Sequence, residues 1–142
     1  MAGMMTHTCK SLILHCIDFR FGRAIKNYLE EQKLLGDCDI VAVAGAVKGI
    51  ASPKLESDRE FILRQIEISK SLHHINQIIL MNHTDCGAYG GRSAFPSRTE
   101  EEKTHRAEMQ KAADIIRERY PNIEIKLVLA NIEESGEIRF TL

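Results

Sequence analysis

The stretch Met81-Asn82-His83-Thr84-Asp85-Cys86-Gly87-Ala88-Tyr89-Gly90-Gly91 decides how the fold of this chain is interpreted. It follows an apolar run at residues 78–80, which predicts a buried strand. His83 and Cys86 lie three residues apart, and the glycines that follow allow the backbone to approach a ligand closely. An imidazole and a thiolate at the end of a strand are typical zinc ligands, but two ligands do not make a site. The fold must therefore bring a third ligand to this turn.

The composition indicates an ordinary globular protein. Of the 142 residues, 44% are hydrophobic and 27% are charged, and the formal net charge is -1. The length is typical of one domain, which we expect to span residues 1–142. The charge gives no electrostatic reason to expect binding to nucleic acid or to an anionic membrane. No apolar run is long enough to cross a bilayer.

The cysteines are expected to be reduced. The N-terminus lacks the charged and apolar segments of a secretion signal, so we expect a cytoplasmic protein without a disulfide framework. Cys9 and Cys38 match no motif, and we interpret both as structural. His73 and His74 follow each other at the end of a predicted helix, and we interpret them as favourable partners of the helix dipole rather than as metal ligands.

Apolar runs and helical periodicity alternate along the chain. Buried strands are predicted at residues 11–17, 39–44, 77–81 and 123–130. Helices are predicted between them, at residues 22–35, from about Ser57 to Leu72, and at residues 100–120. A turn at residues 134–136 returns the chain as a short antiparallel edge strand at residues 138–142. We therefore expect a single α/β domain with a mainly parallel central sheet flanked by helices.

The ends and faces of these helices can also be predicted. Gly36 is expected to end the first helix, and Ser57 or Asp58 to cap the second. The buried face of the second helix is expected to include Phe61, Ile62, Ile66 and Leu72. The three glutamates at residues 100–102 are interpreted as an exposed first turn of the third helix.

Cys16 is the candidate for the third ligand because it ends the first predicted strand. The carboxyl ends of parallel strands lie at one edge of a sheet, where ligands of open α/β sheets bind. If the first and third strands are neighbours, about 5 Å apart, then Cys16, His83 and Cys86 converge on one point. Three such ligands leave one position of a tetrahedral zinc ion open, which is typical of a catalytic site. We expect one Zn²⁺ per chain.

Asp18 and Arg20 flank the same point. In an extended segment Cys16, Asp18 and Arg20 lie on one side of the chain. The guanidinium of Arg20 would keep Asp18 ionised and oriented. Asp18 could then accept a hydrogen bond from water beside the metal, or it could move onto the metal and close the site.

The pattern Cys16-x-Asp18-x-Arg20, followed by His83-x-x-Cys86-Gly87, resembles the β-class carbonic anhydrases. The resemblance covers most of the chain in element order. It implies zinc on Cys16, His83 and Cys86, Asp18 and Arg20 as the catalytic dyad, and hydration of carbon dioxide to bicarbonate. It also implies a homodimer or higher homo-oligomer. We expect the small-molecule substrate to contact Gly45, through its backbone N–H, and Gly87.

The loop after the second strand differs from the family pattern. The family usually has Arg-Asn before Ala-Gly, whereas this chain has Ala42-Val43 before Ala44-Gly45. A zinc hydrolase of another small linear molecule, such as carbon disulfide or carbonyl sulfide, is therefore a second hypothesis. A non-catalytic zinc module, closed by Asp18, is a third. A thiol redox protein that uses Cys16 and Cys86 is a fourth.

The route of the proton to solvent is not evident from the sequence. His7, His15 and His105 are candidate shuttles by residue type alone. Asp85 lies between two predicted ligands, and we interpret it as a turn residue outside the site.

Overall fold

The computed structural model describes residues 7–142. It contains one five-stranded sheet in the order β2-β1-β3-β4-β5. The strands are β1 Ser11–His15, β2 Cys38–Ala42, β3 Gln77–His83, β4 Glu124–Ile132 and β5 Ile138–Thr141. The first four are parallel, and β5 pairs antiparallel with β4. The predicted fold class is confirmed, including the antiparallel edge strand.

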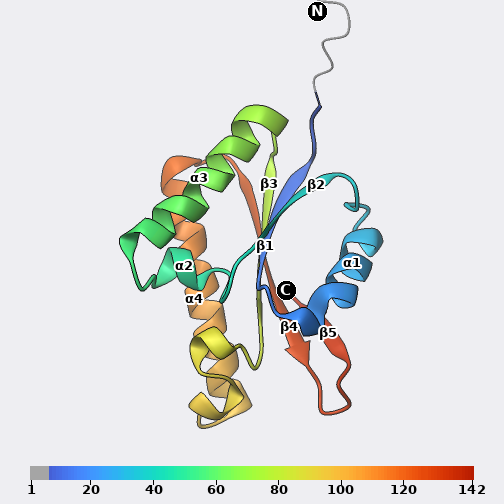
Figure 1. Cartoon of the computed structure of the whole chain (residues 1–142), viewed down its shortest axis with the longest axis vertical. Coiled ribbons are helices and arrows are strands. Elements are labelled where there is room, and N and C mark those ends of the chain that lie inside the picture. Colours follow the sequence, from blue (N-terminus) through green and yellow to red (C-terminus); the bar gives the residue numbers. More distant parts are fainter. Residues whose placement is uncertain (1–6) are drawn as a thin grey trace, which may run out of the picture.

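Helices cover both faces of the sheet. They are α1 Gly22–Glu31, α2 Lys48–Ala51, α3 Glu56–His73 and α4 Arg98–Arg119, with short 3-10 turns η1 Phe19–Phe21, η2 Gly87–Tyr89 and η3 Arg92–Ala94. Figure 1 shows α2, α3 and α4 on one face and α1 on the other. None of the helices within residues 7–142 is long and apolar enough to cross a membrane.

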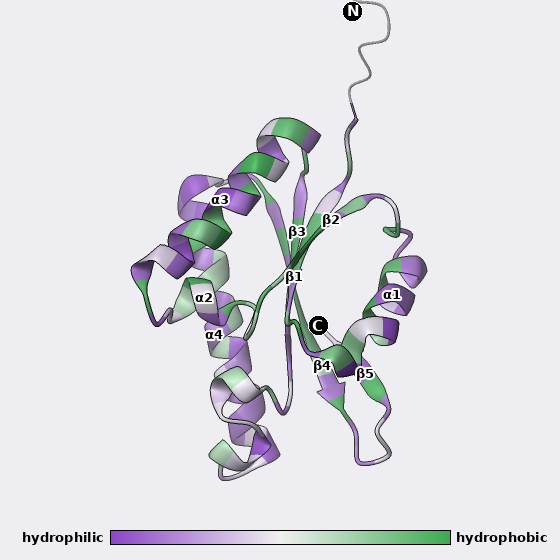
Figure 2. Ribbon diagram, viewed as in Figure 1, coloured by the Kyte–Doolittle hydropathy of each residue, from purple (hydrophilic) through white to green (hydrophobic). Residues whose placement is uncertain are grey.

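Alternating side chains of the central strands build two separate cores. Leu12 and Leu14 of β1 belong to the core on one face, whereas Ile13 belongs to the core on the other. All seven residues of β3 are buried, as expected of a central parallel strand covered by helices. Figure 2 shows the complementary pattern on the helices, where hydrophobic and hydrophilic residues alternate along α3.

The pairing of β1 with β3 places the predicted ligands at one edge. Ser11 is in register with Gln77, and Leu14 with Leu80. The two strands therefore run in the same direction and end at the same edge of the sheet, which confirms the adjacency that the metal hypothesis requires. β3 continues two residues beyond the predicted end, so that His83 is its last residue.

The first two of the three predicted helices, which correspond to α1 and α3, differ from their predicted form. α1 ends at Glu31, because Lys33 and Gly36 adopt left-handed backbone conformations (φ 59° and 80°) that reverse the chain. In α3, the cap position is Leu55, so the prediction that Ser57 or Asp58 caps the helix was wrong. Phe61 is 53% exposed and Leu72 is 60% exposed, so neither lies on the predicted buried face. The remaining two predicted residues of that face, Ile62 and Ile66, are buried.

α4 begins two residues earlier than predicted. The side chain of Ser97 caps it by accepting a hydrogen bond from the Glu100 N–H at 3.1 Å. This bond satisfies one of the free N–H groups of the first turn. The turn is not fully exposed as predicted, since Glu101 is 1% exposed.

Replacement of Ser97 should destabilise the protein through this cap. We expect Ser97→Ala to lower the free energy of unfolding by about 1 kcal/mol, as measured by urea denaturation. Ser93→Ala is the matched control, because Ser93 is exposed and its side chain makes no hydrogen bond among the described residues. Equal unfolding midpoints for the two variants would contradict the assignment of the cap.

Candidate metal centre

Cys16, His83 and Cys86 come together at the carboxyl edge of β1 and β3. Each offers one ligand atom, and the three atoms all lie within 4.8 Å of one another. The two sulfur atoms are 4.0 Å apart. All three residues are buried. The structure therefore assembles the set of donors that the spacing along the chain predicted.

The ring of His83 is held with one nitrogen directed at this cluster. Its Nδ1 donates a hydrogen bond to the Thr84 carbonyl oxygen at 2.6 Å, which leaves the lone pair on Nε2. The Nε2 atom is buried and has no hydrogen-bond partner among the described residues. Because a buried acceptor without a partner is costly, this atom fits a metal ligand. The donor set of two thiols and one imidazole fits zinc.

The two thiols affect each other's ionisation. The hydrogen bond from Cys86 lowers the pKa of the Cys16 thiol, and the same contact raises the pKa of Cys86. The backbone N–H of Gly45 also faces the Cys16 sulfur and lowers its pKa further. A divalent cation bound between the two sulfurs would favour two thiolates.

Asp18 and Arg20 form a bidentate ion pair beside the cluster. Arg20 donates from Nη2 to Asp18 Oδ2 at 2.6 Å and from Nε to Asp18 Oδ1 at 3.0 Å. Its backbone N–H also donates to Asp18 Oδ1, at 2.9 Å. These hydrogen bonds from Arg20 hold the pKa of Asp18 below its ordinary value. Asp18 Oδ2 lies 3.7 Å from His83 Nε2, so the carboxylate stands next to the position that a metal would occupy.

Asp85 belongs to this arrangement, contrary to its interpretation as a turn residue outside the site. Arg20 donates to its side chain from Nη1 at 3.1 Å and to its backbone carbonyl from Nη2 at 2.9 Å. Asp85 also accepts from the Arg92 N–H at 2.8 Å. The hydrogen bonds from Arg92 and Arg20 lower its pKa. Asp85 therefore holds the Arg20 guanidinium in addition to its contacts with Asp18. The position of Asp85 between two predicted ligands was the sequence signal for this role.

A buried carboxylate supports the turn from behind. Glu101 accepts from the Asp85 N–H at 2.7 Å and from Arg92 Nε at 3.4 Å. Arg92 also donates to Thr84 Oγ1 at 3.1 Å and to the Ile132 carbonyl oxygen at 3.0 Å. These contacts connect the His83–Cys86 turn to α4 and β4. No local pattern in the sequence distinguishes Glu101 from the glutamates on either side of it.

Gly45 and Gly87 both line an open hollow in front of the cluster. Its lining comprises Cys16, Ile17, Asp18, Phe19, Arg20, Ala44, Gly45, Asp85, Cys86, Gly87, Ala88, Gly90 and Gly91. Gly45 has φ +77°, and a Cβ there would lie 2.9 Å from the Ala88 side chain, so the position requires glycine. A Cβ at Gly87 would meet no atom within 4 Å. Phe19, 91% exposed, makes the rim of the hollow apolar. Substrate contact with either glycine stays a prediction.

His105 does not reach solvent. It is fully buried, and its Nδ1 lies 3.0 Å from the side-chain nitrogen of Asn82. Burial lowers the pKa of His105 to about 4, so its ring is neutral at ordinary pH. The structure therefore gives no support to His105 as a shuttle that passes protons to solvent.

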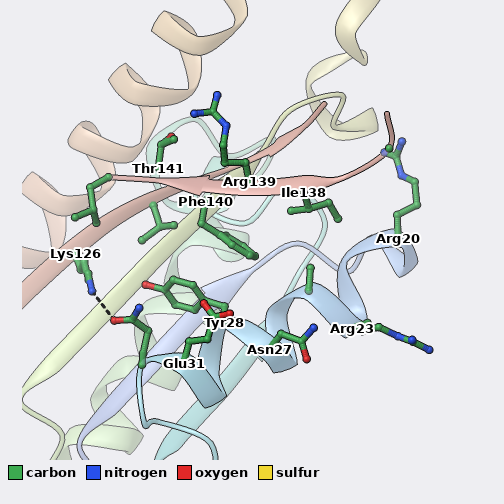
Figure 3. Close-up of a pocket in the computed structure, with 15 residues that line it drawn as sticks. Arg20, Arg23, Asn27, Tyr28, Glu31, Lys126, Ile138, Arg139, Phe140 and Thr141 are labelled. Carbon is green, nitrogen blue, oxygen red and sulfur yellow. Dashed lines mark hydrogen bonds between the residues drawn. The ribbon is translucent and has the colours of Figure 1, made fainter. Parts of the chain in front are cut away.

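A second hollow lies between α1 and β5 and is separate from the cluster (Figure 3). Tyr28 and Phe140 line it, with ring centroids 4.9 Å apart. Arg20 also lines it, so this groove adjoins the catalytic dyad that the sequence predicted. Figure 3 shows Arg139 and Ile138 on β5 above the groove and Asn27 on α1 below it.

Comparison with known proteins agrees with the site geometry described above. A family model described as "Putative carbonic anhydrase" matches residues 6–139. The chain belongs to the β-carbonic anhydrase family. Membership covers nearly the whole chain and agrees with the resemblance of its two metal-ligand motifs.

Relatives of this β-carbonic anhydrase family member include an uncharacterized protein of Rickettsia conorii. The two are 29% identical over 126 residues, which cover 87% of this chain and 68% of the relative. The crystal structure of a carbonic anhydrase from Streptococcus mutans has the same fold, with a TM-score of 0.60 and 19% identity over 100% of this chain and 87% of that one. Tetrameric β-carbonic anhydrases from Sordaria macrospora also match, with a TM-score of 0.51 and 17% identity over 94% of this chain and 81% of theirs.

Loss of the buried carboxylate should destabilise the turn that carries the ligands. In Glu101→Gln an NH₂ group replaces one of the two acceptor oxygens, so either the Asp85 N–H or Arg92 loses its partner. We expect the free energy of unfolding to fall by about 1–3 kcal/mol, measured by urea denaturation. Glu102→Gln, at an exposed position on the same helix turn, should have almost no effect. An equally small effect at both positions would show that Glu101 does not support the turn.

Proposed function

We propose that this protein is a zinc-dependent carbonic anhydrase that interconverts carbon dioxide and bicarbonate. The observation that carries the proposal is the buried Nε2 of His83, which has no hydrogen-bond partner within residues 7–142. This atom faces two thiols next to a bidentate Asp18–Arg20 pair. In this proposal Cys16, His83 and Cys86 hold one Zn²⁺ per chain. Family membership supports the same class of activity.

The residues of the chain position the reacting groups. Bound zinc would act as a Lewis acid and make water a nucleophile near neutral pH. Asp18 is kept ionised by Arg20, so it can accept a hydrogen bond from the attacking water and orient a lone pair of that water toward carbon dioxide. Arg20 cannot move freely, because Asp85 binds it on the opposite side. The apolar rim at Ile17 and Phe19 suits a small substrate without charge.

The contacts of Asp18 favour an open centre over the closed, non-catalytic alternative. To reach the metal position, Asp18 would have to give up hydrogen bonds with both the side chain and the backbone of Arg20. The geometry also disfavours the redox alternative. A redox pair of Cys16 and Cys86 leaves the buried Nε2 of His83 without a role.

A zinc hydrolase of carbon disulfide or carbonyl sulfide remains the second candidate. It is favoured by the apolar rim of the hollow and by Ala42-Val43, where the family usually has Arg-Asn. Both candidates use the same metal ligands and the same dyad, so substrate assays separate them.

The first test is stopped-flow hydration of carbon dioxide, near pH 8, on protein of measured zinc content. We expect a zinc-dependent rate that Cys16→Ser abolishes. Cys38→Ser should keep both zinc and rate, because Cys38 lies outside the cluster. If the wild type holds the zinc ion that Cys16→Ser loses but shows no rate above background, the carbonic anhydrase proposal is overturned. A rate with carbonyl sulfide alone would establish the second candidate.

The role of Asp18 can be tested separately from metal binding. In Asp18→Asn the carboxylate loses its charge and its ion pair with Arg20, so we expect the hydration rate to fall roughly 10²-fold or more with zinc content unchanged. Asp58→Asn, at an exposed position in α3, is the control and should keep the full rate. A loss of zinc in Asp18→Asn would instead support the closed module, in which Asp18 is a ligand.

We further propose that the chain forms a homo-oligomer, as the tetrameric enzymes of Sordaria macrospora do. Within the described residues, β2 and β5 each have a partner strand on one side only. A second copy seated beside β5 would lie next to the groove that Arg20 lines. We expect a mass of at least twice the 16.1 kDa chain by light scattering coupled to size-exclusion chromatography. A monomer across the micromolar range would contradict this proposal.

A further inference from the structure

A second group of metal-type side chains lies at the opposite end of the sheet. It consists of Cys9, Asp39 and His73, whose ligand atoms all lie within 4.8 Å of one another. Cys9 precedes β1, Asp39 is the second residue of β2, and His73 is the last residue of α3. These are the amino ends of the strands, whereas Cys16 and His83 lie at the carboxyl ends. In Figure 1 this end of β1 lies where the chain enters from the N-terminus, next to the end of α3.

The three residues are held together by several contacts. His73 Nδ1 lies 2.6 Å from Asp39 Oδ2, and Ser69 donates to the same carboxylate oxygen. The Cys9 N–H donates to the His73 carbonyl oxygen at 3.0 Å, which fixes the two backbones relative to each other. All three residues are half-buried, so their donor atoms are oriented by the protein and remain within reach of a small ion.

We propose that Cys9, Asp39 and His73 bind a second Zn²⁺ ion, which has a structural role. A thiolate, a carboxylate and an imidazole are a donor set that suits zinc. In tetrahedral coordination such donors are separated by roughly 3.3–3.6 Å, a spacing that follows from ordinary zinc–ligand bond lengths. Small side-chain rotations from the present arrangement would reach it, with the hydrogen bond between His73 and Asp39 replaced by coordination. This inference does not depend on the proposed enzymatic activity.

His7 is placed to supply a fourth ligand. Its ring lies 5.0 Å from the ring of His73, measured between centroids, at an interplanar angle of 61°. His7 is exposed and precedes Cys9 by two residues, so its side chain can turn toward the ion. The ion would then join the entering segment at residues 7–9 to both β2 and α3. The sequence interpretation of Cys9 as structural and of His73 as a dipole partner did not anticipate this arrangement.

The charges around the group also favour a cation. Asp39 and Asp37 both act on Cys9 with negative charge. A zinc ion would neutralise the charge of Asp39 and of a Cys9 thiolate together.

The test counts bound metal by native mass spectrometry, after the metal-free full chain is loaded with ZnSO₄ and excess zinc is removed. We expect two zinc ions per wild-type chain. In His73→Gln the glutamine can still donate a hydrogen bond to Asp39, but it is a poor zinc ligand. The His73→Gln and Cys9→Ser variants should each lose one zinc ion and keep the other. The neighbours provide matched controls, since His74→Gln and Cys38→Ser should retain two ions. Cys16→Ser should lose the ion of the first centre and retain the second.

Thermal unfolding provides an independent readout of the same site. In the Cys16→Ser background, added zinc should raise Tm, because only the folded chain assembles the second site. The rise should vanish when His73→Gln is added to this background. Equal zinc content in wild type, His73→Gln and Cys9→Ser would overturn the proposal. The first centre is judged separately: if Cys16→Ser lost no zinc while His73→Gln did, the second site would stand and the first would fall.

Discussion

The parallel pairing of β1 with β3 is the constraint on which the rest of the structure depends. It brings Cys16 and His83, which are far apart in sequence, to the same edge of the sheet. The pairing is secured by burial, because every residue of β3 is buried between the two cores. A buried hydrogen bond from the Ser11 hydroxyl to the Gln77 side-chain oxygen, at 2.6 Å, adds a polar contact between the two strands. A slip of one residue would send each apolar side chain of β3 to the wrong core. The hydrophobic pattern of the strands thereby also sets the geometry of the metal ligands.

The cluster of Cys16, His83 and Cys86 is supported by a series of charged side chains that extends from solvent into the core. Glu101 is buried in α4 and holds the backbone of Asp85, Asp85 holds Arg20, and Arg20 holds Asp18. Each carboxylate in this series has an arginine or backbone N–H partner, so burial does not leave a charge unpaired. The consequence is that the carboxylate nearest to His83 is oriented before any substrate arrives. Such preorganisation suits a catalytic site better than a purely structural one.

The two ends of the sheet have different properties. At the carboxyl end, an open hollow with an apolar rim lies in front of the buried ligands. The His83 nitrogen that faces the two thiols has no hydrogen-bond partner in the part of the chain that the structure describes. At the amino end, His73 already has a carboxylate partner in Asp39. The first arrangement leaves space for a substrate, whereas the second brings three chain segments together. This difference is the reason for proposing catalysis at one end and a structural ion at the other.

The sequence by itself determined the fold class, the alternation of strands and helices, and the chemical character of the main site. These follow from local patterns: apolar runs mark buried strands, and His83, Cys86 and Cys16 each follow such a run. Only the tertiary structure decided what depends on contacts between distant segments. Glu101 looks like one of three equivalent glutamates until α4 packs behind the turn, and Phe61 looks buried until α3 turns it outward. Cys9 and His73 match no motif because their proximity is created by the packing of α3 against the entrance to β1, which no spacing along the chain encodes.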